Sequence, residues 1–222
     1  MKPTDITTIK LFSKIPDYMQ SLFSDTEYPW EALDRIGEYI ASIYDDLIAH
    51  GYSEIKPGVL AGEGTVIAES ALIEAPAIIG PNSEIRHCAF IRGNVITGEG
   101  CVIGNSTEVK NSVIFDNVQI PHFNYVGDSI LGNKSHLGAG AVCSNVRQDK
   151  NNITVNTEPP ITTTRRKFGA IICDRVEIGC GSVINPGSII GPSSRVYPLT
   201  SVRGVIDANC IVKSSDEIVP IK

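Results

Sequence analysis

The chain has 222 residues and a formal net charge of −6, with 42% hydrophobic residues but only 6% aromatic ones. This length predicts one main domain with a small appendage, and the acidic charge argues against a nucleic-acid-binding function. The six cysteines form no Cys-x-x-Cys pair, and the sequence shows neither a leader pattern nor an apolar run of membrane length. We therefore expect a cytoplasmic protein with reduced cysteines, no bound metal, and neither nucleic acid nor membrane as a partner.

Residues 1–52 are predicted to form a small helical segment. Pro16 suits the first turn of a short helix, and residues 28–31 begin a second one. Apolar residues of the second helix recur at spacings of three and four, which is typical of an amphipathic helix that ends at Gly51. These residues are Leu33, Ile36, Tyr39, Ile40, Ile43, Tyr44, Leu47 and Ile48. We expect the stripe to cover the first coils of the next domain or a neighbouring subunit, with Trp30 as a packing anchor.

From residue 53 onward, aliphatic residues, with one threonine among them, recur at every sixth position. The series contains Ile67, Ile73, Ile79, Ile85, Ile91, Thr97, Ile103 and Val109, and it returns at Ile172, Ile178, Ile184, Ile190, Val196 and Val202. A helix cannot place a six-residue repeat on one face, whereas short strands joined by tight turns can. The repeat therefore indicates a solenoid, in which three hexads close one coil. We predict a mainly β domain over residues 53–213, followed by a tail over 214–222.

The interval between aliphatic residues shortens twice after Val109. It falls from six to five before Ile114 and again before Leu131, so each coil in this part is one residue shorter than three full hexads. On this count Ile103, Ile120 and Leu137 stack at one edge, and Val109, Val126 and Cys143 stack at another. Five polar residues are then expected to converge within two or three coils: Lys110, His122, Tyr125, His136 and Asn145.

Stacking of coils also predicts a pair of adjacent cations. Residues 18 apart lie above one another on strands about 4.8 Å apart, so Arg92 and Lys110 are expected side by side. Two such charges repel each other unless an anion lies between them or water solvates them, and a phosphate would satisfy both. Geometry alone does not choose between a phosphate site and two solvated surface cations.

Residues 146–169 interrupt the hexads with a polar stretch that contains Arg165-Arg166-Lys167. A loop of this length inside a compact repeat is usually functional or disordered, and insertions in solenoids commonly project to the binding face. The basic cluster is therefore either part of a binding site or a solvated loop tip.

The hexads resemble those of the hexapeptide-repeat family, which implies a single-stranded left-handed parallel β-helix. A block of residues makes the likeness sharper: Lys110, the Pro-His-Phe-Asn-Tyr-Val-Gly-Asp of residues 121–128, the Leu-Gly-Ala-Gly of 137–140, and Asn145. It resembles the C-terminal acetyltransferase domain of bifunctional UDP-N-acetylglucosamine pyrophosphorylase/glucosamine-1-phosphate N-acetyltransferases over about residues 53–202. The resemblance implies acetyl-CoA-dependent N-acetylation of an amino sugar, expected to be a hexosamine-1-phosphate of nucleotide-sugar or cell-surface polysaccharide synthesis. It also implies a homotrimer.

Carried over residue by residue, the resemblance implies specific roles. His122 is the implied general base that takes a proton from the sugar amine, and Asn145 orients the amine or the acyl carbonyl. The implied substrate-binding residues are Arg92, Lys110, Tyr125 and His136, and the implied acetyl-CoA contacts are Ala139 and Cys180.

Two departures from the family pattern keep a second hypothesis open. His136 replaces an asparagine and residues 146–147, Val-Arg, replace Tyr-Asp, which leaves a non-catalytic scaffold or regulatory partner of a sugar-1-phosphate nucleotidyltransferase as the alternative. A zinc hydratase of the carbonic anhydrase type needs histidines about five residues apart on facing coils. The sequence intervals between His87, His122 and His136 are all much longer, which does not fit. No Gly-rich phosphate loop precedes Ser53, so no nucleotidyltransferase activity is expected from this chain.

Overall fold

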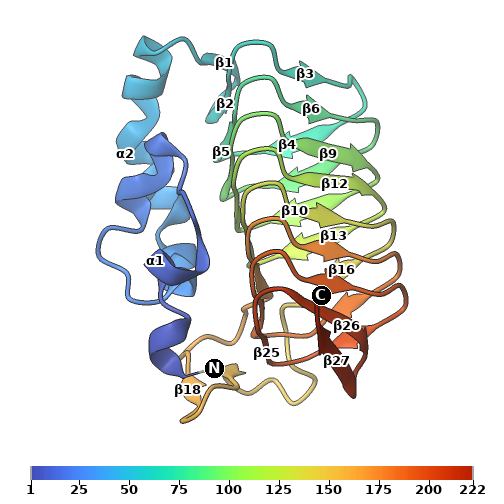
Figure 1. Ribbon diagram of the computed structural model, residues 1–222. Helices are drawn as coiled ribbons and strands as arrows, with labels where there is room; N and C mark the ends of the chain where they lie inside the picture. Colours follow the sequence, from blue (N-terminus) through green and yellow to red (C-terminus); the bar gives the residue numbers. More distant parts are fainter. Residues whose placement is uncertain (1, 222) are drawn as a thin grey trace.

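A computed structural model describes residues 2–221 and shows a stack of short strands flanked on one side by helices (Figure 1). Three sheets of nine, seven and nine strands form the sides of the stack, and the parallel neighbours in each sheet belong to successive coils. The predicted fold class is confirmed: the domain is a left-handed parallel β-helix with a small helical segment at its N-terminus.

Each sheet is one side of the triangular coil. Sheet A contains β1 (Ser53–Lys56), β2 (Val59–Ala61), β5 (Ala77–Ile79), β8 (Val95–Thr97), β11 (Ser112–Ile114), β14 (Ile130–Leu131), β19 (Ala170–Ile172), β22 (Ser188–Ile190) and β25 (Val205–Ile206). Sheet B contains β3 (Val66–Ile67), β6 (Glu84–Ile85), β9 (Val102–Asn105), β12 (Gln119–His122), β15 (His136–Leu137), β20 (Glu177–Ile178), β23 (Arg195–Val196), β26 (Cys210–Ser214) and β27 (Glu217–Pro220). Sheet C contains β4 (Leu72–Glu74), β7 (Phe90–Arg92), β10 (Glu108–Lys110), β13 (Tyr125–Gly127), β16 (Val142–Cys143), β21 (Val183–Ile184) and β24 (Ser201–Val202).

An antiparallel pair closes each end of the solenoid. β1 pairs with β2 before the first coil, and β26 pairs with β27 after the last one. The segment expected to be a tail therefore supplies β27, the second strand of a hairpin. Closing both ends in this way covers backbone groups that a bare terminal coil would leave unpaired.

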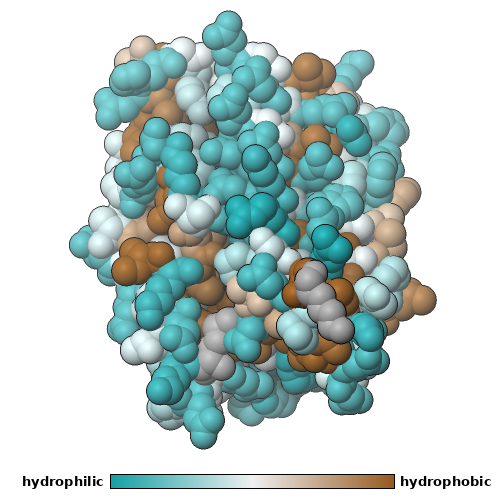
Figure 2. All heavy atoms as spheres, in the orientation of Figure 1, coloured by the Kyte–Doolittle hydropathy of each residue, from teal (hydrophilic) through white to brown (hydrophobic). Residues whose placement is uncertain are grey.

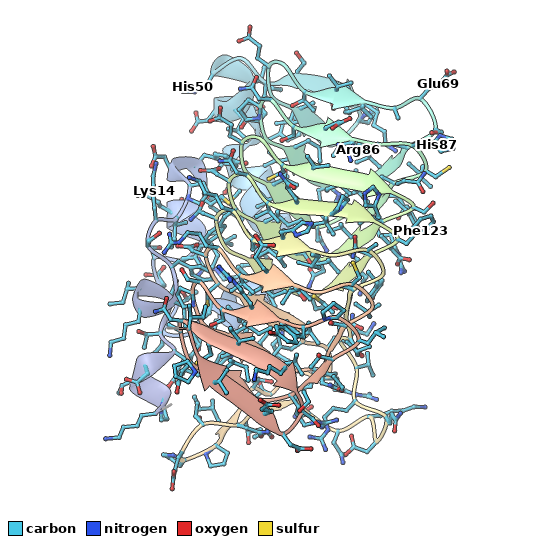
Figure 3. The ribbon with its side chains drawn as sticks, turned by 45° about the vertical axis from the view of Figure 1, so that its right-hand side comes forward. Lys14, His50, Glu69, Arg86, His87 and Phe123 are labelled. Atoms are coloured by element: carbon cyan, nitrogen blue, oxygen red, sulfur yellow. The ribbon has the colours of Figure 1, made fainter. Side chains whose placement is uncertain are left out.

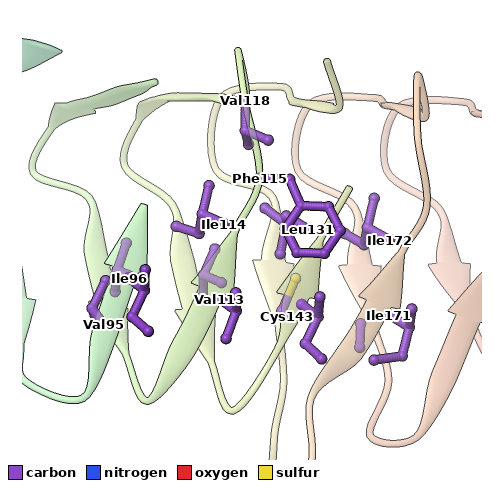
Figure 4. Close-up of a cluster of buried hydrophobic side chains, with 14 of the residues drawn as sticks. Val95, Ile96, Val113, Ile114, Phe115, Val118, Leu131, Cys143, Ile171 and Ile172 are labelled. Atoms are coloured by element: carbon purple, nitrogen blue, oxygen red, sulfur yellow. The ribbon is translucent and has the colours of Figure 1, made fainter. Parts of the chain in front are cut away.

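The hexad residues fill the interior of the solenoid. Val109 pairs with Val126, and Ile103 pairs with Ile120, which confirms the shortened coils predicted after Val109. All four side chains are fully buried. Figure 4 shows how such residues stack from coil to coil, as Ile114, Leu131 and Ile172 do in sheet A. Aliphatic side chains that meet their equivalents one coil away need few aromatic residues to fill the core.

The N-terminal segment contains two α-helices, α1 (Thr8–Leu11) and α2 (Ile36–Ala49), and three 3-10 helices, η1 (Pro3–Asp5), η2 (Asp17–Leu22) and η3 (Pro29–Asp34). The prediction of one continuous helix from residue 28 is wrong, because the chain divides it into η3 and α2. The buried residues Trp30, Ala32 and Leu33 lie almost consecutively in η3, and the single stripe of an α-helix cannot bury such a run. Gly51 follows the end of α2 with a φ of 93°, so the helix ends where predicted.

This segment covers the outer face of sheet A (Figure 1). On that face the residues before the hexad positions are buried too: Leu60, Ile78, Ile96, Val113, Ile130 and Ile171. Val66 on sheet B and Leu72 on sheet C, at matching positions, are 64% and 51% exposed. The Tyr18 hydroxyl donates to the Thr97 carbonyl, and the Phe12 and Phe115 rings lie 4.8 Å apart. Ile36, Tyr39 and Ile40 of the stripe are buried and α2 contacts β8, so the apolar stripe covers the solenoid of its own chain.

Residues 146–169 form a structured insertion rather than an open loop. Its strands β17 (Thr154–Val155) and β18 (Ile161–Thr162) pair antiparallel. The insertion contacts the N-terminal segment, because Phe168 packs 5.5 Å from Trp30 and Arg165 forms an ion pair with Asp34. Trp30 is 3% exposed and stacks on Tyr28. Its predicted role as a packing anchor is confirmed.

The face of the molecule in Figure 2 is largely hydrophilic, with apolar residues gathered in small patches. Among residues 2–221, no helix is long and apolar enough to cross a membrane.

Candidate active site

Most of the predicted site residues lie around the outer face of sheet C. Tyr125 begins β13, and its side chain is half-buried on that face. His122 is the last residue of β12, at the corner between sheets B and C. Asp128 follows β13 at the corner between sheets C and A. The two corners of this one coil therefore border the face on which Tyr125 lies.

The carboxylate of Asp128 joins three neighbouring residues. Its Oδ2 accepts a hydrogen bond from Asn145 Nδ2 at 2.5 Å and lies 3.5 Å from Lys110 Nζ. Its Oδ1 accepts a hydrogen bond from Asn111 Nδ2 at 2.8 Å. Asp128 is only 3% exposed, so one cation and two amides compensate a buried charge. The sequence predictions assign no role to Asp128, although the Gly-Asp pair after Tyr125 is part of the recognised block.

Tyr125 and Asn145 lie close together above Gly127. A Cβ atom on Gly127 would lie 2.5 Å from Tyr125 Oη and 2.7 Å from Asn145 Nδ2, so a larger residue here would displace these two side chains. Burial, followed by the charges of Glu108 and Asp128, raises the pKa of Tyr125. Its phenol therefore stays protonated at neutral pH and can donate a hydrogen bond.

Arg92 and Lys110 occupy neighbouring strands in the predicted stacked register. Each of them has a carboxylate partner: Arg92 Nη1 lies 2.7 Å from Glu108 Oε1, and Lys110 Nζ lies 3.5 Å from Asp128 Oδ2. The hydrogen bond to Glu108 raises the pKa of Arg92. The mutual repulsion of the two cations is thus relieved within the protein, and their phosphate-binding role stays a prediction.

His122, Ala139 and Cys180 lie one below another along the corner between sheets B and C. The carbonyl of His122 accepts a hydrogen bond from Gly140 N at 3.0 Å, and that of Ala139 accepts one from Gly181 N at 2.8 Å. All three residues are exposed, and the described part of the chain offers the His122 ring no hydrogen-bond partner. Figure 3 shows this corner through Phe123, the neighbour of His122, and His87 two coils earlier. The implied base and the implied acetyl-CoA contacts therefore share one open corner.

His136 and Arg147 lie apart from the Asp128 cluster. His136 points outward on sheet B, where its Nδ1 is 2.9 Å from Glu177 Oε2. Arg147 pairs with Asp149 at 2.9 and 2.6 Å, and this contact lowers the pKa of Asp149. The structure thus brings Lys110, Tyr125 and Asn145 together, places His122 across sheet C, and puts His136 on another side of the coil. That separation arises because His136 precedes Leu137 on β15 and so faces away from sheet C.

The three histidines of the hydratase hypothesis do not share a site. His87 Nδ1 lies 2.5 Å from Ser70 Oγ at the open corner, whereas His136 contacts Glu177 on sheet B. Within residues 2–221, no three His, Cys, Asp or Glu side chains are arranged to hold a metal ion.

Comparison with known proteins agrees with the recognised block. Residues 73–164 match the family described as GMPPB C-terminal domain. The "Bifunctional protein GlmU" of Methanococcus maripaludis is 34% identical over 202 residues, which is 90% of this chain and 46% of that protein. The match to GlmU covers almost the whole length of this chain. The predicted resemblance is therefore confirmed, and the chain spans about half the length of the curated relatives it matches.

Two further proteins complete the comparison. The "Bifunctional sugar-1-phosphate nucleotidylyltransferase/acetyltransferase" of Sulfurisphaera tokodaii is 34% identical over 195 residues, which is 83% of this chain and 47% of that protein. Among solved structures, a mutant of AntD, an N-acyltransferase from Bacillus cereus, has a TM-score of 0.45 and 17% identity, and the match covers 80% of this chain and 87% of that one.

Proposed function

We propose that the chain is an acetyl-CoA-dependent N-acetyltransferase that acts on an amino sugar. The name of the Sulfurisphaera tokodaii relative, which includes acetyltransferase activity, supports this reading. The observation that carries it is the arrangement around sheet C. At one edge of the face stands His122, which is exposed and has no side-chain hydrogen-bond partner within residues 2–221. At the other edge the half-buried Lys110 and the buried Asn145 both contact the buried Asp128.

The reaction joins the sugar amine to the acetyl carbon of the thioester and releases CoA as a thiol. His122 accepts the proton that the amine loses, and its open corner gives a substrate access to the ring. Asn145 donates its Nδ2 to Asp128, so its Oδ1 points away and is available to accept a hydrogen bond from the sugar.

The remaining residues bind the two substrates in this proposal. Tyr125 donates a hydrogen bond to the sugar from the centre of the face, and Arg92 and Lys110 lie where a sugar phosphate would be held. Acetyl-CoA lies along the corner beside Ala139 and Cys180, below His122.

We also propose that a second copy closes this corner within a homotrimer. Sheet A is covered by the N-terminal segment, whereas Phe123 at the corner is 65% exposed and Val183 on sheet C is 39% exposed. Such apolar residues fit a contact between subunits. All six cysteines are free, which fits the reducing cytoplasm.

The test is thiol release from acetyl-CoA against a panel of amino sugars and their 1-phosphates. His122→Ala should lower turnover by on the order of 10²–10⁴-fold, the usual contribution of a general base. His87→Ala is the matched control, since it removes another exposed histidine at the same corner. Absence of turnover with every sugar, in a folded trimer, would overturn the proposal and favour the non-catalytic scaffold.

A further inference from the structure

The last residues of the insertion are hydrogen-bonded to two residues of the candidate site. The backbone N–H of Phe168 donates to the carbonyl of Asn145 at 3.0 Å, and that of Gly169 donates to the carbonyl of Asp128 at 2.8 Å. The side chain of Asn145 also donates to Asp128 Oδ2 at 2.5 Å. Asn145 is therefore held from two sides, and a displacement of residues 168–169 would shift its backbone.

The ring of Phe168 is held in turn by the N-terminal segment. Phe168 is fully buried, and its ring centroid lies 5.5 Å from that of Trp30. Trp30 is buried as well and stacks on Tyr28, with ring centroids 4.7 Å apart. Buried rings in such contact cannot move independently, because a gap between them would forfeit their packing. A continuous series of contacts therefore leads from Trp30 through Phe168 to Asn145.

A second contact joins the same helix to the same end of the insertion. Arg165 is 10% exposed and forms an ion pair with Asp34, the last residue of η3, which also contains Trp30. Its Nε donates to the carbonyl of Lys167 at 3.2 Å, so it also holds the backbone just before Phe168. A guanidinium this deeply buried needs a counter-charge. Asp34 therefore fixes Arg165, and η3 contacts the end of the insertion at two points.

The other polar contacts of the N-terminal segment lead elsewhere. Ser13 bonds the carboxylate of Asp174, and the Tyr18 hydroxyl donates to the carbonyl of Thr97 on β8. These contacts attach the segment to the solenoid and do not involve the insertion. Figure 1 shows β18 of the insertion beside the N-terminal segment, away from the upper part of α2. Within this segment, η3 is thus the element whose contacts lead to the candidate site.

We propose that Trp30 and Asp34 are positioning residues of the candidate active site. They act through Phe168 and Arg165, which hold the backbone of Asn145, and the inference rests on the proposed function for what Asn145 does there. The N-terminal segment thus takes part in acetyl transfer as well as covering sheet A. A shift of about 1 Å in a group that orients a substrate can lower the rate by about 10²-fold, so a distant contact of this kind affects the reaction.

Hydrogen exchange of the full chain, followed by mass spectrometry of peptides over residues 165–170, tests the coupling without any need for turnover. In Asp34→Ala the buried guanidinium of Arg165 loses its counter-charge and moves toward water. The amides of Phe168 and Gly169 should then exchange at least about ten-fold faster than in the wild type. Asp34→Glu keeps the charge and should restore slow exchange. Trp30→Leu tests the second contact and should also accelerate exchange.

Tyr18→Phe is the matched control, because it removes a hydrogen bond of the same segment that leads to β8 instead of the insertion. It should leave exchange over residues 165–170 unchanged. Exchange that is equal in the wild type, Asp34→Ala and Trp30→Leu would overturn the proposal. Exchange that accelerates equally in Tyr18→Phe would overturn it too, since the segment would then only stabilise the fold.

Steady-state kinetics test the consequence for the reaction. In Asp34→Ala, kcat/KM for the amino sugar should fall by about ten-fold or more, and Asp34→Glu should recover it. The KM for acetyl-CoA should stay the same, since Ala139 and Cys180 lie at a different corner. An unchanged kcat/KM in an active enzyme would overturn the proposal. If the chain never transfers acetyl groups, yet exchange accelerates only in the Asp34→Ala and Trp30→Leu variants, the positioning of Asn145 stands and the proposed function falls.

Discussion

Asn145 and Asp128 lie one coil apart and are joined by a 2.5 Å hydrogen bond from Asn145 Nδ2 to Asp128 Oδ2. The same oxygen of Asp128 faces Lys110 Nζ at 3.5 Å. A single buried carboxylate thus sets the direction of an amide and the position of a cation, both of which face the proposed sugar. Asp128 acts through these neighbours and is therefore a positioning residue.

Replacing Asp128 tests that role. Asp128→Asn should lower the free energy of unfolding by about 1–3 kcal/mol, because Lys110 loses its carboxylate and an amide group then faces the donors of Asn111 and Asn145. The KM for the amino sugar should rise as well, while the KM for acetyl-CoA stays the same. Urea unfolding followed by circular dichroism gives the first quantity, and steady-state kinetics give the other two.

Asp149→Asn is a matched control, since Asp149 is an exposed carboxylate paired with Arg147. Its change in unfolding free energy should stay below about 0.5 kcal/mol. Equal stability and equal KM values in the Asp128 and Asp149 variants would show that the buried carboxylate positions nothing.

Cysteine labelling tests the location of acetyl-CoA. Cys88 and Cys180 are both exposed at the corner between sheets B and C, but only Cys180 lies below His122 and Ala139. CoA should therefore slow alkylation of Cys180 and leave that of Cys88 unchanged. Mass spectrometry after timed labelling measures both rates in one sample. Equal protection of the two thiols, or of neither, would place the acetyl-CoA site elsewhere.

The solenoid could be predicted residue by residue because its core is periodic. A six-residue period fixes which residues face inward, and each shortened interval removes one residue from a coil, so even the pairing of Val109 with Val126 follows. The same periodicity places Arg92 beside Lys110. Each interior residue stacks on its equivalent one coil away, so the repeat in the sequence indicates the contact directly.

Contacts of the insertion could not be predicted in this way. Asn111, Asp128 and Asn145 lie one shortened coil apart and so stack at one corner, whereas Arg165 pairs with Asp34 from the N-terminal segment. No period connects Arg165 with Asp34, since their contact depends on how the insertion and the helices pack. His136 shows where the periodic argument fails. Its sequence distance from His122 predicts that the two side chains lie close together, but the side chain of His136 points outward from β15 on sheet B.

Alkaline pH should destabilise the fold through buried thiols. Burial raises the pKa of Cys101 and Cys143 to about 12, from an ordinary value near 9. The unfolded chain then loses these protons at a lower pH than the folded chain. The contribution of each thiol to the free energy of unfolding is fully present below about pH 9 and is lost between pH 9 and 12. The loss is about 1.4 kcal/mol per pH unit for each thiol. Urea unfolding at a series of pH values from 8 to 11 measures this slope.

Variants separate the buried thiols from other alkaline groups. Cys143→Ala should remove the contribution of one thiol from the slope of unfolding free energy against pH, whatever its effect on stability at pH 8. Cys88→Ala, which removes an exposed thiol, is the matched control. A slope that is the same in all three proteins would contradict the assignment.

The N-terminal segment is attached to the solenoid by Asp174, a 1% exposed carboxylate at the corner between sheets A and B. Its Oδ2 accepts hydrogen bonds from Ser13 N at 2.8 Å and from Ser13 Oγ at 2.5 Å, and its Oδ1 accepts one from Asn133 N at 2.8 Å. Trp30, the only tryptophan, lies where this segment meets the insertion, so its fluorescence reports whether the segment is docked.

Asp174→Ala should cost about 2–4 kcal/mol, because several hydrogen bonds to one charged group are lost and their donors remain near the core. It should also separate two transitions that coincide in the wild type, with Trp30 fluorescence changing at a lower urea concentration than the circular dichroism of the solenoid. Asp5→Ala, which removes an exposed carboxylate from the same segment, should leave the transitions together. Coincident transitions in the Asp174 variant would mean that the segment is held mainly by its apolar stripe on sheet A, and that the Ser13 contact contributes little to docking.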